Sequence, residues 1–180
     1  MSTATEADLL YPLSLFRQRY EVSLPVLEVI SGEQVPEPYR ALLVHQGDMT
    51  SRLEAFHRDD IVLTVLHRDR TAAGYEREVI LCLEDSGLPV EYGAIEIELE
   101  EFEPSLRQKI LEEHLPLGGL LNSYHIRYSS RPRAFIRIVA DEVMDQIFHV
   151  PRGQVFYGRC NELLNEQGHV FARIVEVLRP

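Results

Sequence analysis

The stretch from residue 60 to residue 99 restricts the fold most, because apolar and polar residues alternate there in three successive segments. Alternation with a period of two indicates strands, and the short polar or glycine-containing turns between the segments are typical of antiparallel neighbours. The three predicted strands are DIVLTVLHR, YEREVILCL and VEYGAIEIEL, joined by RTAAG and EDSG. A similar alternation in RLEAFH, before the turn HRDD, predicts a fourth strand and therefore a four-stranded antiparallel meander.

The rest of the chain adds helices and further strands. Prolines near helix starts and mixed apolar spacing predict four helices, at EPYRALLVH, SLRQKILEEHL, LGGLLNSYH and ADEVMDQIF. Strands are predicted at RAFIRIV and in a last hairpin, VFYGRCNELL and HVFARIVEVL, around NEQG. We therefore expect one α+β domain over residues 1–180, with an antiparallel sheet of about six or seven strands and helices packed on one face. Residues 1–35 are expected to be an irregular lead-in with about one helical turn, because Pro12 and Pro25 interrupt its short apolar clusters.

The charge of the chain excludes several partners. A net charge of −11, from 29 acidic and 18 basic residues, disfavours contact with nucleic acid and with anionic membranes. The sequence has no apolar stretch approaching 18 residues, and acidic residues stand near the N-terminus where a signal peptide is basic, so we expect a cytoplasmic protein.

The residues that usually bind metals or cofactors are scattered. Cys82 and Cys160 lie in apolar runs without a CxxC partner and are expected to be buried thiols. The seven histidines show no metal-binding spacing, and glycine-rich nucleotide-binding motifs are absent from the sequence. We expect neither a metal nor a cofactor.

Two charged residues fall on the apolar face of their strands. Arg77 shares a face with Tyr75, Val79 and Leu81, and Glu176 shares a face with apolar residues of the last strand. A buried charge needs compensation. The two residues either pair with each other, face water because of a bulge, or bind a ligand. Among the arginines at alternate strand positions, Arg133, Arg137 and Arg159, the best further candidate is Arg159.

Four segments, taken in order, resemble the chorismate pyruvate-lyases, small cytoplasmic enzymes that convert chorismate to 4-hydroxybenzoate and pyruvate. The segments are HQGDMTSRLEAF, YEREVILCLEDSGLPV, LPLGGLL and GHVFARIVEVLRP, and they span roughly residues 40 to 180. The first 40 residues match nothing in the characterised enzymes.

The resemblance implies a fold of the chorismate lyase type and a set of site residues. Arg77 and Glu176 would be the catalytic polar groups, and Met49 and Leu117 would contribute main-chain groups to the pocket. Arg77 would hold the ring carboxylate in a bidentate pair and Glu176 would lie at the ring hydroxyl. Gly118 would let backbone amides approach the ligand. The second carboxylate of chorismate would need another cation, for which Arg159 or Arg131 is available.

The same fold class also resembles the effector-binding domain of GntR-type repressors, which senses small ligands without chemistry. A binding or sensing protein for a small aromatic carboxylate is therefore the alternative to a carbon-oxygen lyase. Oligomeric state is open at this point.

Overall fold

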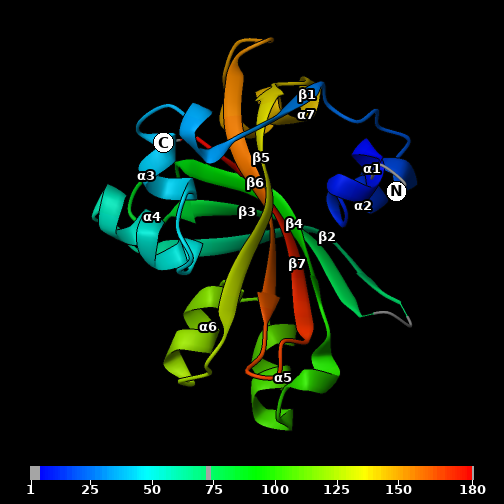
Figure 1. Ribbon diagram of the computed structural model, residues 1–180, viewed down its shortest axis with the longest axis vertical. Coiled ribbons are helices and arrows are strands. Elements are labelled where there is room, and N and C mark those ends of the chain that lie inside the picture. The colour runs from blue at the N-terminus through cyan, green and yellow to red at the C-terminus, as the bar shows by residue number, and fades with distance from the viewer. Residues whose placement is uncertain (1–4, 72–73, 180) are drawn as a thin grey trace.

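The computed structural model describes residues 5–71 and 74–179, which form a seven-stranded antiparallel sheet with short helices against it (Figure 1). The strands are β1 (Leu27–Ile30), β2 (Ile61–Arg70), β3 (Tyr75–Leu83), β4 (Pro89–Ile97), β5 (Ser129–Val139), β6 (Val155–Leu164) and β7 (Val170–Leu178). Their order across the sheet is β1-β5-β6-β7-β4-β3-β2. The hairpins β3–β4 and β6–β7 therefore lie side by side at the centre, joined by pairing of β4 with β7.

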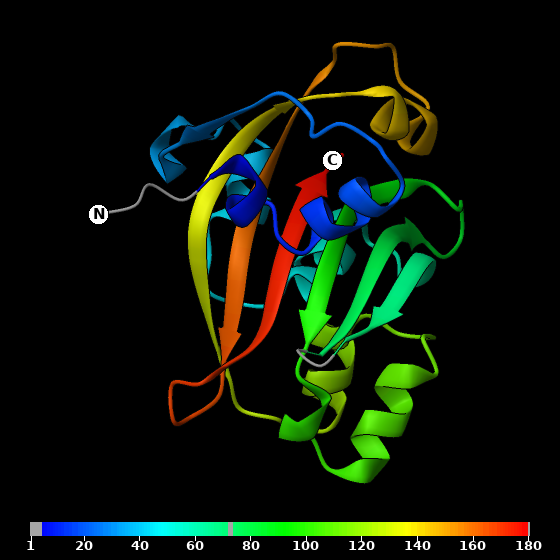
Figure 2. The same cartoon turned by 90° about the vertical axis from the view of Figure 1, so that its right-hand side faces the viewer.

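Helices cover both faces of this sheet. They are α1 (Glu6–Leu9), α2 (Leu13–Arg19), α3 (Tyr39–Leu43), α4 (Met49–His57), α5 (Pro104–Leu111), α6 (Leu117–Ser123) and α7 (Glu142–Phe148), with 3-10 turns at Gly32–Gln34 and Leu99–Glu101. Helices α3 to α6 pack on the face that we call the pocket face, where Leu53 of α4 and Leu120 of α6 are in its core. The expected α+β fold with an antiparallel sheet is confirmed, and α3 to α6 form the expected helical layer on one face. Helices α1, α2 and α7 add a second layer on the opposite face (Figure 2).

The predicted strand at RLEAFH was wrong, because these residues belong to helix α4. Asp48 caps the helix by accepting a hydrogen bond of 2.7 Å from the Ser51 amide. Met49 and Leu53, four residues apart, are buried, whereas Phe56 is 44% exposed. The buried residues thus follow a helical spacing, and the meander has three strands.

The lead-in segment is more regular than we expected. It contains α1, α2 and strand β1, which pairs with β5 at one edge of the sheet. Leu10, Leu13 and Phe16 are buried in the core of the opposite face. The other edge is β2, whose pairing with β3 shifts between Val65 and His67. The turn predicted at RTAAG includes residues 72 and 73, which lie outside the described residues.

Both cysteines are free thiols. Cys160 is buried, as expected, and burial raises the pKa of its thiol to about 12, so it is unreactive at neutral pH. Cys82 is only partly buried. Within the described part of the chain, the helices are too short or too polar to cross a membrane.

Candidate ligand-binding site

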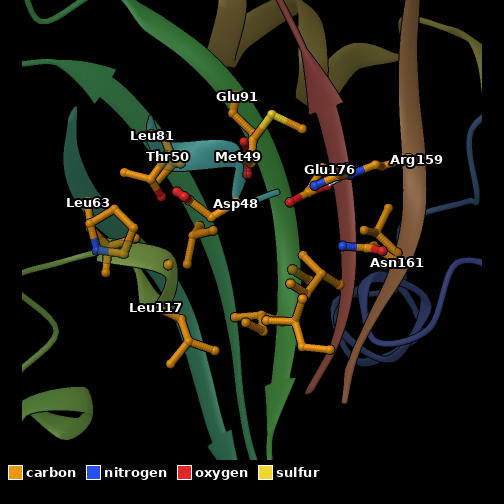
Figure 3. Close-up of a pocket in the computed structure, with 18 of the residues that line it drawn as sticks. Asp48, Met49, Thr50, Leu63, Leu81, Glu91, Leu117, Arg159, Asn161 and Glu176 are labelled. Atoms are coloured by element: carbon orange, nitrogen blue, oxygen red, sulfur yellow. Dashed lines mark hydrogen bonds and ion pairs between the residues drawn. The ribbon is translucent and has the colours of Figure 1, made fainter. Parts of the chain in front are cut away.

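A cavity lies between the pocket face of the sheet and the first turns of α4 and α6 (Figure 3). The empty space between these elements is about 610 Å³ when the open mouth is included. The walls are mainly aliphatic and are formed by Leu63, Val79, Leu81, Ile95, Leu117, Leu163 and Ile174. A small flat molecule would lose most of its contact with water here.

Strand register explains why several charged side chains reach this cavity. Residues paired across antiparallel strands share a face, and the register pairs Arg159 with Glu176 and Arg77 with Ile95. Arg77 is 1% exposed, Arg159 is 1% exposed and Glu176 is 4% exposed. All three line the cavity. Arg77 and Glu176, which the alternation of side chains placed on the apolar faces of their strands, do lie on the face that carries the cavity.

Glu176 forms a buried ion pair with Arg159, not with Arg77. The Arg159 Nε donates to Glu176 Oε2, and Nη1 donates to the main-chain oxygens of Leu43 at 3.2 Å and His45 at 3.3 Å. The Arg159 guanidinium is therefore committed to protein groups. It ties strands β6 and β7 to the chain between α3 and α4, and the alternative of an Arg77–Glu176 pair is not what the structure contains.

Arg77 is far less well satisfied. Its Nη1 is 3.5 Å from the carbonyl oxygen of Ile110, and its Nε has no hydrogen-bond partner among the described residues. Burial lowers the pKa of its guanidinium, and this is only partly opposed by the charges of Tyr75 and Glu113 and by a hydrogen bond with Tyr75. The Glu113 carboxylate is itself taken by the Tyr75 hydroxyl and by Arg68 at 2.7 Å. Arg77 thus brings a buried positive charge that its protein neighbours compensate only in part, with its Nε unpartnered in the described structure.

Sequence reasoning missed two further polar residues of the cavity, Glu91 and Asn161. Glu91 is 5% exposed, and its Oε2 has no hydrogen-bond partner among the described residues. Burial raises the pKa of Glu91 well above 4.5, and the charge of Glu176 raises it further. The Asn161 Oδ1 accepts a hydrogen bond from Ser130, but its Nδ2 lacks a partner in the described structure. Parity within residues 89–97 would have found Glu91, since it shares a face with Ile95.

Met49 in the first turn of α4, and Leu117 and Gly118 in the first turn of α6, line the same cavity as the site residues predicted on the strands. A Cβ atom on Gly118 would lie 3.2 Å from the Thr50 Oγ1 and 3.3 Å from the Asp48 side chain. Gly118 therefore permits the close packing of α6 against α4, which differs from the expected approach of backbone to ligand.

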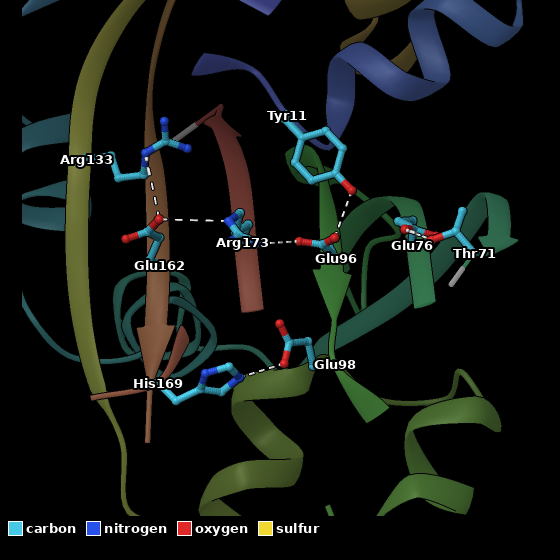
Figure 4. A network of polar contacts seen from close by, with 9 residues as sticks. All are labelled: Tyr11, Thr71, Glu76, Glu96, Glu98, Arg133, Glu162, His169 and Arg173. Carbon is cyan, nitrogen blue, oxygen red and sulfur yellow. Dashed lines mark hydrogen bonds and ion pairs between the residues drawn. The ribbon is translucent and has the colours of Figure 1, made fainter. Parts of the chain in front are cut away.

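Arg131 does not reach the cavity. It lies on the opposite face of the sheet, where its Nη2 is 2.6 Å from Glu162. Glu162 also lies 3.9 Å from Arg133 and from Arg173, which in turn is 2.7 Å from Glu96 (Figure 4). Arg131 is thus excluded as a partner for a second ligand carboxylate, and Arg159 is occupied by Glu176.

The charges of the cavity do not cancel. Arg159 and Glu176 neutralise each other, and Glu91 favours its neutral form. Asp48, at the mouth, uses its carboxylate to cap α4 and to accept a hydrogen bond of 3.0 Å from Asn122. The remaining buried charge is that of Arg77, so the interior favours an anionic ligand.

Comparison with known proteins identifies structures that share the fold of this chain. No protein-family model matches the sequence, and no curated protein matches it. The effector domain of PhnF from Mycobacterium smegmatis superposes with a TM-score of 0.57 at 11% identity, over 74% of this chain and 88% of that chain. The possible transcriptional regulator YydK from Bacillus subtilis gives a TM-score of 0.56 at 10% identity, over 96% of this chain and 85% of that chain. At these identities the likeness establishes a shared fold and nothing finer.

Proposed function

We propose that this protein binds a small aromatic carboxylate in the cavity and acts as a sensor or carrier of that ligand. The observation that carries the proposal is Arg77, a buried guanidinium whose Nε is unpartnered among the described residues and whose charge the protein compensates only in part. A carboxylate would complete its hydrogen bonds, because the guanidinium fork matches a carboxylate in a bidentate pair. The likeness to the PhnF effector domain supports a binding function.

The aliphatic walls favour a ring attached to that carboxylate. Val79 and Ile95 lie on the sheet beside Arg77, and Leu117 lies across the cavity on α6. A flat apolar body between these walls gains burial without presenting further charges to them. Our expectation that the chain does not bind nucleic acid rests on its net charge of −11 and stays a prediction.

The first test is calorimetric titration of benzoate and 4-hydroxybenzoate into the wild-type protein and an Arg77→Met variant. We expect binding by the wild type and a loss of about tenfold to 100-fold in affinity in the variant, because charge-assisted hydrogen bonds are worth about 1.5–3 kcal/mol. The matched control is Arg131→Met, which removes a cation from the opposite face and should leave affinity unchanged. Equal binding by wild type and Arg77→Met would contradict the proposal.

A chorismate pyruvate-lyase is the second candidate, favoured by one specific observation. Arg77, Glu176, Met49 and Leu117, which the family resemblance assigns to its site, all line the same cavity. In that reaction the ring would lose the enolpyruvyl group as pyruvate and become 4-hydroxybenzoate, with Arg77 orienting the ring carboxylate. Incubation with chorismate should then yield pyruvate and 4-hydroxybenzoate in equal amounts, and Arg77→Met should abolish both. Binding of 4-hydroxybenzoate without turnover of chorismate would leave the binding function alone.

A further inference from the structure

Two carboxyl groups from neighbouring strands reach the cavity side by side. Glu176 of β7 is paired in register with Gly93 of β4, and Glu91 is two residues from Gly93 on the same face. Diagonal neighbours of this kind have Cα atoms roughly 7–8 Å apart, within reach of two long side chains. Figure 3 shows Glu91, Glu176 and Arg159 around the same space.

The two carboxyl groups have opposite surroundings. Glu176 is ion-paired with Arg159, whereas Glu91 has an oxygen without a partner in the described structure. The ionisable groups that line the cavity come from the N-cap of α4, four strands and the loop before β5, and they are Asp48, Arg77, Glu91, Tyr128, Arg159 and Glu176.

Among these groups, the Arg159 charge lowers the pKa of Glu91, but by less than burial and the Glu176 charge raise it. Arg159 is engaged by Glu176, and Arg77 lies on β3 in register with Ile95, four residues along β4 from Glu91. Strand spacing puts the Cα atoms of Arg77 and Glu91 about 14 Å apart. Burial and the Glu176 charge therefore favour the neutral form of Glu91, while Glu176 is held in its ion pair with Arg159.

A neutral carboxylic acid donates a hydrogen bond through its O–H, whereas an ionised carboxylate only accepts. We propose that Glu91 is the specificity-determining residue of this cavity and that it donates a hydrogen bond to a ligand hydroxyl, which in turn donates to Glu176. The ligand class is then a hydroxy-substituted aromatic monocarboxylate, with its acidic group at Arg77 and its hydroxyl at the Glu91–Glu176 pair. A second anionic group at that end is disfavoured, because it would lie beside the Glu176 carboxylate while Arg159, the cation there, is already engaged by Glu176. This inference rests on the proposed binding function and specifies its ligand.

The test compares three probes, 4-hydroxybenzoate, benzoate and benzene-1,4-dicarboxylate, by calorimetric titration at neutral pH. In the wild type, 4-hydroxybenzoate should bind about tenfold to 100-fold more tightly than benzoate, because benzoate leaves buried polar groups unpaired. The dicarboxylate should bind more weakly than benzoate. In Glu91→Leu the preference for the hydroxyl should fall to about twofold or less, while Glu91→Gln, whose amide also donates, should retain it.

The control is Glu76→Gln, since Glu76 is also buried with an unpartnered oxygen but lies on the opposite face of the sheet. This variant should keep the wild-type ligand preference. If benzoate and 4-hydroxybenzoate bind equally to the wild type, or if Glu91→Leu leaves their ratio unchanged, the inference is overturned and the proposed binding function survives. If neither probe binds, the proposed function fails as well.

A second measurement decides the inference without any ligand. Infrared spectra of the wild type at neutral pH should contain a carboxylic acid C=O band that disappears in both Glu91→Gln and Glu91→Leu. Identical spectra of the three proteins in that region would mean that Glu91 is ionised, and this would overturn its role as a donor.

Discussion

On the opposite face of the sheet, charges of alternating sign follow one another from strand to strand, whereas on the pocket face they do not. Glu162, Arg173 and Glu96, on β6, β7 and β4, form successive ion pairs, and the Tyr11 hydroxyl also donates to Glu96 at 2.8 Å (Figure 4). The row ends at Glu76, which has one unpartnered oxygen. On the pocket face, the described charges that line the cavity form a single ion pair, between Arg159 and Glu176. A paired charge therefore holds strands together, whereas an incompletely paired one that faces the cavity, such as Arg77, is available to a ligand.

The largest expected effect on stability comes from breaking the ion pair between Arg159 and Glu176 on the pocket face. Arg159→Met leaves Glu176 as a buried carboxylate without its cation, which should lower the free energy of unfolding by about 3–5 kcal/mol. Arg173→Met, on the opposite face, should cost only about 1 kcal/mol, since Arg173 is 36% exposed and Glu96 keeps Tyr11. Urea unfolding of both variants measures the difference. Equal losses would mean that the two faces treat their charges alike.

An intermediate effect should appear in the pH dependence of stability. The folded-state pKa of Glu91 is raised above 4.5, so its contribution to stability is present below that pH and is lost as the pH rises through the folded-state pKa. Above pH 4.5 the wild type should therefore lose stability relative to Glu91→Gln, by up to about 1.4 kcal/mol per pH unit. Thermal unfolding across this range measures the change. Parallel curves for the two proteins would show that Glu91 titrates normally.

The smallest effect concerns the walls of the cavity. Gly118→Ala places a Cβ 3.2 Å from the Thr50 Oγ1 and should separate α6 from α4, with a cost of about 1 kcal/mol and weaker ligand binding. Gly119→Ala meets nothing within 4 Å and should stabilise α6 by up to about 1 kcal/mol. Melting temperatures of the two variants should therefore move in opposite directions. A shift in the same direction would indicate that the helices adjust freely.

Periodicity was sufficient for most of the fold. Strands β2 to β7 and helices α3, α5, α6 and α7 all lie where alternation and proline positions placed them. It failed at residues 52–57, because a short amphipathic helix with mixed apolar positions also alternates, and the Asp48 cap was not considered. It also missed β1, whose four residues are held by pairing with β5, and a contact so distant in the sequence leaves no local signal.

Part of the candidate site could also be predicted from the alternation of side chains along the strands. Arg77 and Glu176 broke the parity of strands that were otherwise apolar on one face, and the structure brings both to the cavity. The partner of Glu176 could not be predicted from the sequence, because its pairing with Arg159 depends on the register of β6 against β7. The neutral form of Glu91 depends on what stands next to it in space, and parity alone says nothing about that.

The free edge of β2 has a consequence for how copies of this protein meet. An uncovered strand offers a row of main-chain donors and acceptors to any other strand, and such rows promote aggregation. Here the register shift between Val65 and His67 bends the strand, and Arg68, Asp69 and Arg70 crowd its end with charge. Both features oppose extension of the sheet from one molecule into the next.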